Sequence, residues 1–566
     1  MAKKTRNKVS AKAGTPSRMS PREINPQPQP ELLSVALALL GHEPDLSPGE
    51  AAAVAGIKPC TDNALVERFR IAIAKGNDPL GDCFCKLRNA VDRRRHGQTF
   101  TPTGIVSAMI RKAQAEVEKG GAFAQVVDGG AGTGRFALAA GRAFRKADIV
   151  AIEPDPVCAV LLRANLAVAG MADRVTILVS DFRDVKLPPA GRRLFIGNPP
   201  YVRHHDIEEH WKKWYAATMR TLGADKVSKL AGLHLYFFAR VGEVAKPGDV
   251  GVFVTAAEWI DTNYGAALRA SLCARLGGVS VQVVDAKAEP FPGVMTTAAI
   301  TVFHPHQAPK VIKLQAVANV SELDTLAGGV IRPATDLASA KKWHPRFFSP
   351  ATIHVLNAPR SGTRVGSLFR VSRGQVTGAN HIWIAGEKAA NLPARFLFPC
   401  VTGANELFAA SEDGGQLKHL DHLRRVVNLP RDLDTLSRWE RPAVDAFLTW
   451  AEQEGGNRGY IATHRSPWWA IRLLPAAPIV CTYMARRPPV FIRNIAGACL
   501  LNIAHGLYPR VSMSDIDLDN ACLALNKASS LNDGRVYAGG LTKFEPGAVE
   551  DMFIDWTSFT WLETAV

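Results

Sequence analysis

The sequence has 566 residues, which is too long for one ordinary domain and sufficient for two or three domains with sizeable cores. Hydrophobic residues make up 47% of the chain and charged residues 21%, a composition that excludes disorder over the whole chain. The 68 Lys and Arg residues outnumber the 52 Asp and Glu residues by 16, and this excess favours a polyanionic partner such as nucleic acid.

Cysteine usage and hydropathy narrow the class of protein further. The nine cysteines are spread along the chain without any C-x-x-C pair, so neither a disulfide framework nor a structural zinc site is expected. No run of about 18 uncharged apolar residues is present, and the polar, basic N-terminus lacks the apolar stretch of a signal peptide. We therefore expect a soluble, cytoplasmic protein with no metal and no membrane association.

The N-terminal part of the chain divides into a tail and a small helical region. Residues 1–30 carry seven Lys or Arg, one Glu and several Pro, so they cannot bury a core and are expected to form a disordered basic tail. From residue 31 to 96 apolar residues recur at helical spacing, as in ELLSVALALL and ALVERFRIAIAK. We interpret this region as a helical lead-in to the next domain.

Residues 97–310 alternate between short β-branched runs and helical stretches, which is typical of a parallel sheet covered by helices. The expected strands span 124–128, 148–153, 174–180, 193–198, 249–256, 279–286 and 298–304. Seven strands are enough for one doubly wound α/β domain. We expect a linker over 311–345, and then a second large domain of mixed α/β character over 346–566.

A glycine-rich turn follows the first expected strand in the segment VVDGGAGTG. Asp128 ends the strand, and Gly130, Gly132 and Gly134 allow the backbone to approach a ligand near the N-terminus of the next helix. Taken alone the turn is ambiguous, because it also satisfies a loose dinucleotide fingerprint with Glu153 about 20 residues on. A glycine-rich turn without any ligand is a third interpretation.

Two acidic residues are expected at the carboxyl ends of neighbouring strands, the edge at which open α/β sheets bind ligands. Glu153 ends the second strand and would suit a ribose diol, whereas Asp181 and Phe182 follow the third strand. Asp181 could accept from the exocyclic amine of an adenine while Phe182 covers the ring. Any solvent-facing strand end tolerates an acid, and for Asp181 alone that simpler interpretation is favoured.

The motif IGNPPYVR directly after the fourth strand is the most informative one in the sequence. Pro199 and Pro200 stiffen the turn, so the side-chain oxygen of Asn198 and the carbonyl of Pro199 can be directed at one incoming NH₂ group. Tyr201 then offers an aromatic face on which a planar group can stack. At this distance after a glycine-rich turn, the motif favours chemistry on an amine carried by a planar ring.

Together these motifs resemble those of the gamma-type N6-adenine DNA methyltransferases of restriction-modification systems, the TaqI-like enzymes. Two flanking segments strengthen the resemblance: GQTFTPTGIV matches the family's T-P motif at Thr101 and Pro102, and AEPFPGVM matches a later motif at Phe291. The segment DGGAGTG departs from the Pro-x-Cys-Gly-x-Gly of many relatives but keeps the glycine positions. The resemblance is strong over the catalytic half and only suggestive over the C-terminal half.

The resemblance implies a class I S-adenosylmethionine-dependent methyltransferase fold, with a Rossmann-like seven-stranded sheet and a C-terminal target-recognition domain. It implies a site-specific, adenine-specific DNA methyltransferase that binds S-adenosylmethionine and flips the target adenine out of double-stranded DNA. The base would lie between Tyr201 and Phe291, and Thr101 and Pro102 would line the methionine end of the cofactor. A separately encoded restriction endonuclease is compatible with this role as a second partner.

Two other classes of function stay open on the sequence alone. N-P-P-Y also serves methyltransferases that act on RNA adenine or on protein glutamine, although those chains are usually shorter. A catalytically idle DNA-binding subunit could retain the fold, but intact Asp128, Asn198 and Tyr201 argue against it. A fused restriction nuclease is disfavoured because no convincing P-D…E-x-K cluster is found.

Overall fold

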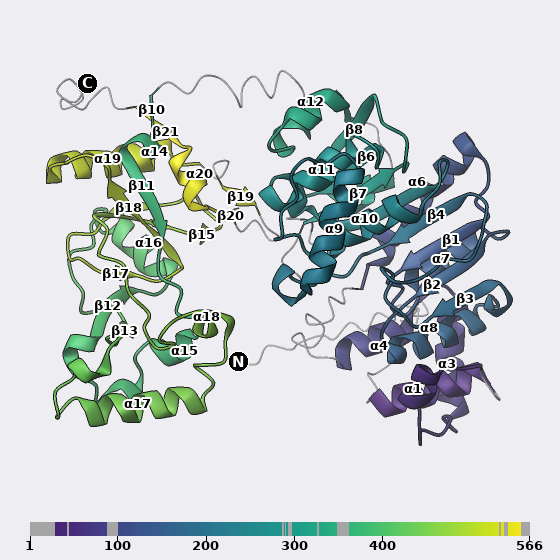
Figure 1. Ribbon diagram of the computed structural model, residues 1–566, viewed down its shortest axis with the longest axis horizontal. Coiled ribbons are helices and arrows are strands. Elements are labelled where there is room, and N and C mark those ends of the chain that lie inside the picture. Colours follow the sequence, from purple (N-terminus) through teal and green to yellow (C-terminus); the bar gives the residue numbers. More distant parts are fainter. Residues whose placement is uncertain are drawn as a thin grey trace, which may run out of the picture. The chain divides into compact units, whose positions relative to one another are not determined.

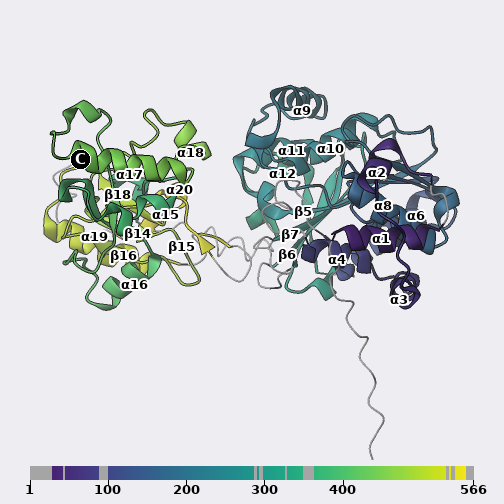
Figure 2. The same cartoon turned by 90° about the horizontal axis from the view of Figure 1, so that it is seen from below.

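A computed structural model describes residues 29–41, 45–87, 100–285, 288, 290–291, 297–324, 328–347, 362–530, 534–536 and 542–555. The chain forms two compact units, shown from two directions in Figures 1 and 2. The N-terminal unit comprises Met1–Val283, Ala299–Gln315 and Val320–Phe347, and the C-terminal unit comprises Val284–Ala298, Ala316–Asn319 and Phe348–Val566. The tail expected over 1–30 lies outside the described residues up to residue 28.

A nine-stranded sheet forms the centre of the N-terminal unit, in the order β3-β2-β1-β4-β5-β7-β6-β8-β9. Its strands are β1 (Gln125–Gly129), β2 (Asp148–Ile152), β3 (Val175–Leu178), β4 (Arg193–Gly197), β5 (Val250–Ala256), β6 (Gly278–Val284), β7 (Ala298–Phe303), β8 (Val311–Val317) and β9 (Val330–Pro333). All pairs from β3 to β5 in this order are parallel. The expected Rossmann-like α/β class is confirmed, and the seven expected strands are present.

The α-helices that accompany these strands are α6 (Thr103–Gly120), α7 (Arg135–Ala143), α8 (Pro156–Val168), α9 (Glu209–Thr221), α10 (Leu233–Val244), α11 (Ala266–Leu272) and α12 (Ala334–Ser339). Helices α7 to α11 connect strands of this sheet, as expected for parallel neighbours that need crossover connections, whereas α6 precedes β1 and α12 follows β9. Local sequence explains some of their ends: α8 begins with Pro156, and the Asp155 side chain accepts from Val157 N.

The N-terminal helices pack against the sheet domain and do not form a separate body. They are α1 (Gln29–Leu40), α2 (Pro48–Ala53), α3 (Asn63–Ala74) and α4 (Pro79–Leu87). Leu33, Phe69 and Phe84 share one buried cluster with Cys158 and Leu161 of α8. Both views show α1 beside α8 (Figures 1 and 2). The helical lead-in therefore completes the core on this side of the unit.

The expectation of a linker over 311–345 is wrong for most of that segment. Strands β8 and β9 within it pair antiparallel and extend the sheet beyond the seven expected strands. Further on, Trp343 is fully buried, 5.9 Å from the ring of Trp259, and its Nε1 donates to Leu337 O at 2.9 Å. The contact of Trp343 with Trp259 joins residues 84 positions apart, so the local sequence did not indicate it.

The C-terminal unit contains a four-stranded antiparallel sheet in the order β11-β18-β14-β16, with smaller sheets β13-β12-β17 and β15-β20-β19 and the pair β10-β21. Its strands are β10 (Thr363–Arg364), β11 (Phe369–Arg373), β12 (Leu397–Val401), β13 (Arg425–Val427), β14 (Ile479–Thr482), β15 (Met484–Ala485), β16 (Phe491–Arg493), β17 (Cys499–Leu500), β18 (Ala504–Pro509), β19 (Arg535–Val536), β20 (Thr542–Lys543) and β21 (Phe553–Ile554). Its helices are α14 (Val365–Leu368), α15 (Asn380–Trp383), α16 (Ala404–Glu412), α17 (Arg441–Gln453), α18 (Tyr460–Thr463), α19 (Asp515–Ala528) and α20 (Pro546–Glu550).

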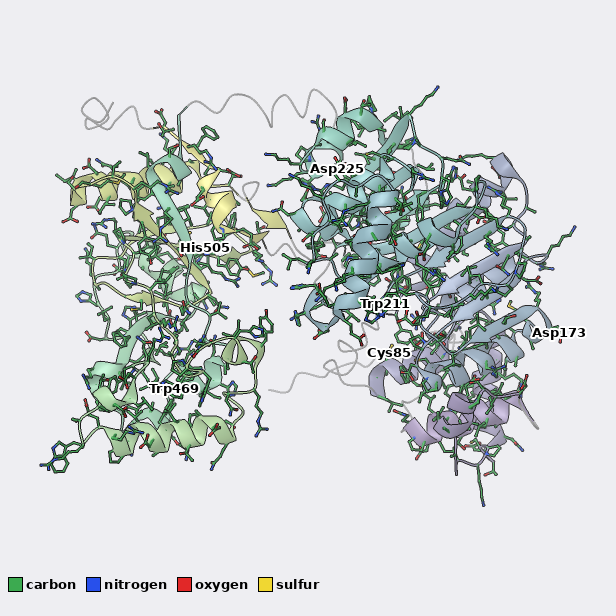
Figure 3. The ribbon with its side chains drawn as sticks, in the orientation of Figure 1. Cys85, Asp173, Trp211, Asp225, Trp469 and His505 are labelled. Atoms are coloured by element: carbon green, nitrogen blue, oxygen red, sulfur yellow. The ribbon has the colours of Figure 1, made fainter. Side chains whose placement is uncertain are left out.

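Polar groups inside the C-terminal unit bond mainly to backbone carbonyls. Trp469 Nε1 donates to Pro430 O at 3.1 Å, and His505 Nε2 lies 2.7 Å from Phe544 O; both side chains are labelled in Figure 3. The first bond joins two loops, and the second joins β18 to the residue that follows β20. Over the described ranges of both units, we find no helix that is long and apolar enough to span a bilayer.

The burial of Trp343 predicts a large loss of stability in Trp343→Ala. Removing a fully buried indole should lower the free energy of unfolding by about 3 to 5 kcal/mol. Trp439→Ala is the matched control, because Trp439 is 77% exposed, and it should change that free energy by less than about 0.5 kcal/mol. Urea unfolding followed by circular dichroism compares the two variants, and equal losses would contradict the packing of residues 334–347 onto the sheet.

Candidate active site

The candidate site lies where the order of strands in the sheet reverses. β1 is paired with β2 on one side and with β4 on the other, so the loops that follow β1 and β4 diverge. A cavity of about 370 Å³ opens there. Its wall is formed by Phe100, Thr101, Gly130, Ala131, Gly132, Thr133, Arg135, Phe136, Ile152, Glu153, Pro154, Asp155, Pro156, Asp181, Phe182, Asn198, Pro200, Leu233 and Phe237.

The glycine-rich turn forms one side of the cavity in a conformation that requires glycine. Gly130, Gly132 and Gly134 have φ values of 122°, 56° and 97°, which L side chains rarely adopt. A Cβ on Gly134 would also lie 2.5 Å from Leu162 Cδ1. Gly130 and Gly132 line the cavity, whereas Gly134 precedes α7 and allows close packing against α8.

Asp128 lies beneath the turn and not on the cavity wall. It is fully buried, and its Oδ2 accepts from the backbone N of Ala137 at 3.2 Å, in the first turn of α7. Gly134 has no side chain that could cap this helix, so Asp128 provides the cap from the preceding strand. Burial, together with the nearby Glu153 carboxylate, raises the pKa of Asp128 to about 8.

Glu153 places a carboxylate on the cavity wall at the end of β2. It is only 5% exposed; its Oε2 accepts from Gly132 N at 2.8 Å, and its Oε1 accepts from Asp155 N at 3.0 Å. The glycine turn is therefore hydrogen-bonded directly to this carboxylate. An acceptor at the end of the second strand suits a diol, as expected for the ribose of a nucleoside.

Asp181 and Phe182 line the cavity after β3, as the sequence predicts. The Phe182 ring lies 5.2 Å from that of Phe237, and a Cβ on Gly129 would meet the Phe182 ring at 2.8 Å. Asp181 is paired with Arg183, whose Nη2 lies 2.6 Å from Oδ2. Burial alone would raise the pKa of Asp181, but the hydrogen bonds from Arg183 hold it below its usual value. Arg183 in turn stacks on Trp211, which is labelled in Figure 3.

The N-P-P-Y loop begins at the end of β4 and joins the T-P segment at the cavity. Asn198 Nδ2 donates to Thr101 Oγ1 at 3.1 Å, and Asn198, Thr101 and Pro200 all line the cavity. Pro199 is buried behind them. Pro102 stands just outside, as the residue that precedes the first turn of α6. Residues almost 100 positions apart are thus brought together by the fold.

Tyr201 packs against a histidine that the sequence analysis did not identify. The Tyr201 ring lies 5.4 Å from that of His234, near the start of α10, and burial raises the pKa of the Tyr201 hydroxyl. His234 is 6% exposed, and neither of its ring nitrogens has a hydrogen-bond partner among the described residues. Burial lowers the pKa of His234 to about 4, so the imidazole is neutral at pH 7. Phe291 is buried in a segment of the C-terminal unit, and its pairing with Tyr201 stays a prediction.

Eleven of the nineteen wall residues were not named from the sequence, among them Arg135, Phe100 and Phe237. Arg135 is the first residue of α7, and Phe100 precedes the T-P segment; the guanidinium lies 5.3 Å from the centre of the Phe100 ring. Phe237 comes from α10, in the aromatic segment LHLYFF downstream of N-P-P-Y. Arg135 and Phe100 lie directly beside recognised motifs, and that position was the available signal for them; Phe237 lies 36 residues after Tyr201. In the described parts of the chain, we find no group of three or more His, Cys, Asp or Glu side chains that could hold a metal ion.

Comparison with known proteins gives matches over both units. Residues 193–275 match the model of the Eco57I restriction-modification methylase, and residues 340–560 match that of the C-terminal domain of the type II methyltransferase M.Eco57I. The chain is 44% identical over 540 residues to the type II methyltransferase M.XamI of Xanthomonas campestris pv. amaranthicola. The aligned region covers 93% of this chain and 98% of that protein. The chain belongs to the type II methyltransferases of restriction-modification systems.

Two more distant relatives also match this methyltransferase. The type II methyltransferase M.AccI of Acinetobacter calcoaceticus is 23% identical over 495 residues, covering 83% of this chain and 87% of that protein. A tRNA1(Val) (adenine(37)-N6)-methyltransferase of Shewanella amazonensis is 35% identical over 112 residues, covering 19% of this chain and 47% of that protein. The first match spans most of the chain, whereas the second is confined to a short part of it.

The buried His234 predicts a pH dependence of stability in this methyltransferase. Its pKa is about 4 in the folded protein against 6.5 ordinarily, so between these values the unfolded chain binds a proton that the folded chain does not. The contribution of His234 to stability should therefore fall as the pH is lowered from 7.5 to 5. We expect His234→Asn to weaken that dependence of Tm, and we expect His210→Asn, a change at an exposed ring on α9, to leave it unchanged. Equal slopes for wild type and His234→Asn would contradict the neutral, buried imidazole.

Proposed function

We propose that the chain is the modification enzyme of a restriction-modification or related defence system, and that it methylates N6 of an adenine at a specific site in double-stranded DNA. Methyl transfer by a type II modification enzyme is the activity of its family. The observation that carries the finer proposal is the position of Asn198. Its side chain lines the same cavity as Glu153 and the glycine turn and is hydrogen-bonded to Thr101.

The cavity fits S-adenosylmethionine in size and in chemistry. Its volume of about 370 Å³ falls in the range of small-molecule sites, and its wall combines apolar rings with a few polar groups. Glu153 would accept from the ribose hydroxyls, Asp181 and Phe182 would hold the adenine, and Thr101 would face the methionine end. S-adenosylmethionine supplies an electrophilic methyl group on its sulfonium when it is bound.

The N-P-P-Y loop suits an amine nitrogen that is a poor nucleophile. The lone pair of adenine N6 is delocalised into the ring, and hydrogen bonds from its NH₂ group to Asn198 Oδ1 and Pro199 O would localise that pair on nitrogen. The nitrogen would then offer this lone pair to the methyl group that the sulfonium supplies, with the sulfur leaving as a neutral thioether and one N6 proton passing to solvent. Positioning and electrostatic stabilisation account for such a step without a covalent enzyme intermediate. The match to an adenine-N6 methyltransferase supports this acceptor.

An adenine inside a duplex cannot present N6 to a buried cavity, so the proposal includes base flipping. Tyr201 would stack on one face of the extruded base and Phe291 on the other. The two aromatic faces would replace the stacking that the base loses when it leaves the duplex. Since Tyr201 directly follows the two prolines, the amine-binding oxygens and the stacking face are held in one stiff turn.

Residues 346–566 are proposed to recognise the DNA target. The family model that covers 340–560 is that of the C-terminal domain of a type II methyltransferase. The whole chain's net charge of +16 favours a polyanionic partner, although residues 346–566 themselves contribute only +3 of it, with 23 Lys and Arg against 20 Asp and Glu. A restriction endonuclease encoded separately is the expected second member of such a system. RNA adenine is the competing substrate, but the tRNA-modifying relative covers only 19% of this chain, whereas M.XamI covers 93%. Methylation of protein glutamine and an idle DNA-binding role are the remaining competing functions.

Methyl transfer from labelled S-adenosylmethionine tests this function. Unmethylated genomic DNA, total RNA and a protein lysate are offered separately, and the product nucleosides are separated chromatographically. We expect label on DNA as N6-methyladenine, and we expect Asn198→Ala to lower the rate about 100-fold or more, as for loss of one group that stabilises a transition state. Label only on RNA or protein would overturn the DNA assignment, and N4-methylcytosine would overturn the choice of base.

The stacking role of Tyr201 predicts different effects for two substitutions. Tyr201→Phe keeps the aromatic face, so it should retain most of the rate. Tyr201→Ala removes that face and should lose roughly 1 to 3 kcal/mol of stacking energy, which is a fall in rate of about 5- to 150-fold. Single-turnover methylation of a duplex oligonucleotide measures both. Equal activity of the two variants would exclude stacking on this ring.

A further inference from the structure

The carboxylate of Asp78, in the N-terminal helical region, accepts hydrogen bonds from residues that line the cavity. Asp78 directly precedes α4 in the N-terminal helical region and is 7% exposed. Its Oδ2 accepts from Thr133 Oγ1 at 2.6 Å and from Arg135 Nε at 2.9 Å. Its Oδ1 accepts from Asn165 Nδ2 at 2.9 Å and from Gly81 N at 2.8 Å. Since a carboxylate can accept about four hydrogen bonds, none of its capacity is left unused.

The chain backbone is adapted to bring Asp78 this close. A Cβ on Gly81 would lie 2.0 Å from Asp78 Oδ2 and 2.4 Å from Thr133 Oγ1. Both distances are far inside van der Waals contact, so the first turn of α4 can approach the glycine turn only with glycine at this position. The close contact between α4 and the glycine turn therefore depends on Gly81.

Arg135 extends this network to the other side of the cavity. Its Nη1 donates to Thr101 O at 3.0 Å, and its guanidinium lies over the Phe100 ring. Burial alone would lower the pKa of Arg135, but the carboxylates of Asp78 and Asp82 raise it, so the group stays charged. Through one arginine, Asp78 connects the glycine turn to the T-P segment, which precedes it by about 30 residues.

We propose that Asp78 is a positioning residue for S-adenosylmethionine, so that the N-terminal helices form part of the cofactor site. This inference rests on the proposed function, because it assigns the cavity to that cofactor. Thr133, Arg135 and Thr101 all line the cavity, and each is held by Asp78 directly or through Arg135. A turn rich in glycine loses much conformational entropy when it is ordered. If Asp78 orders the turn before the cofactor arrives, the loss of that entropy does not lower the affinity for the cofactor.

A second buried carboxylate of the same helices provides a matched control. Glu50 on α2 is fully buried and pairs with Arg163 of α8 through two hydrogen bonds of 3.0 Å. It therefore joins the N-terminal helices to the sheet domain, as Asp78 does. Neither Glu50 nor Arg163 lines the cavity. A general loosening of the helices should affect both variants, whereas a positioning role should distinguish Asp78.

Calorimetric titration of the full-length protein with S-adenosylmethionine tests the proposal. We expect Asp78→Asn to raise the Kd for S-adenosylmethionine about tenfold, which corresponds to about 1.4 kcal/mol. We expect Glu50→Gln to raise it by less than about twofold, even where its Tm without ligand falls as far as that of Asp78→Asn. In steady-state assays, the KM for S-adenosylmethionine should rise in Asp78→Asn, and the KM for DNA should not.

Thr133→Val provides a second variant if Asp78→Asn does not fold. It removes one hydrogen bond to Asp78 at nearly constant volume, and it should weaken cofactor binding in the same direction by a smaller factor. The proposal is overturned if the folded variants at 78 and 133 bind S-adenosylmethionine as wild type does, or if Glu50→Gln weakens binding equally. Failure of the wild-type protein to bind S-adenosylmethionine would instead overturn the proposed function.

Discussion

The cavity exists because β1 is hydrogen-bonded to β2 on one side and to β4 on the other, with all three strands parallel. Helices that leave this point in opposite directions cannot cover the ends of both neighbouring strands, so space remains above the sheet. Four of the recognised motifs follow strands at this edge: the glycine turn follows β1, Glu153 follows β2, Asp181 follows β3 and Asn198 follows β4. The T-P segment joins them from the residues before α6. The chemistry of the site is therefore a consequence of strand order.

A turn made of glycines has few side chains of its own to hold it, and its support comes from neighbours. Asp128 caps α7 from below, Glu153 accepts from Gly132 N, and Asp78 holds the residues beside the last glycine. Each of these acceptors is an oxygen of an acidic side chain, and they lie beside the N-terminal end of α7. Backbone amides in and after the glycine turn need hydrogen-bond acceptors. This need explains the acidic residues around the turn as well as ligand binding does.

The local motifs predicted much of the fold and the site because β-branched runs, glycine turns and N-P-P-Y act over short distances. The seven strands and the wall positions of Thr101, Glu153 and Asn198 follow from them. Long-range contacts were not predictable in this way. Residues 311–345 were interpreted as a linker because the sequence does not show which sheet they join, whereas in the structure β8 and β9 pair with each other and extend the central sheet. Asp78 and His234 lie in ordinary helical segments, and only the tertiary contacts with Thr133 and Tyr201 give them a place at the site.

The ion pair of Asp181 still leaves room for the role that its position suggests. Arg183 donates to Asp181 Oδ1 from its backbone N and from Nε, and to Oδ2 from Nη2. A carboxylate accepts about four hydrogen bonds, so one acceptor direction remains on Oδ2. One amine proton of an adenine needs one such acceptor. Because Arg183 stacks on Trp211, the carboxylate is oriented by α9 through the guanidinium, and its remaining acceptor has a fixed direction. In the proposed function, the arginine that shares this carboxylate would therefore also fix the direction of the hydrogen bond that the adenine amine donates to it.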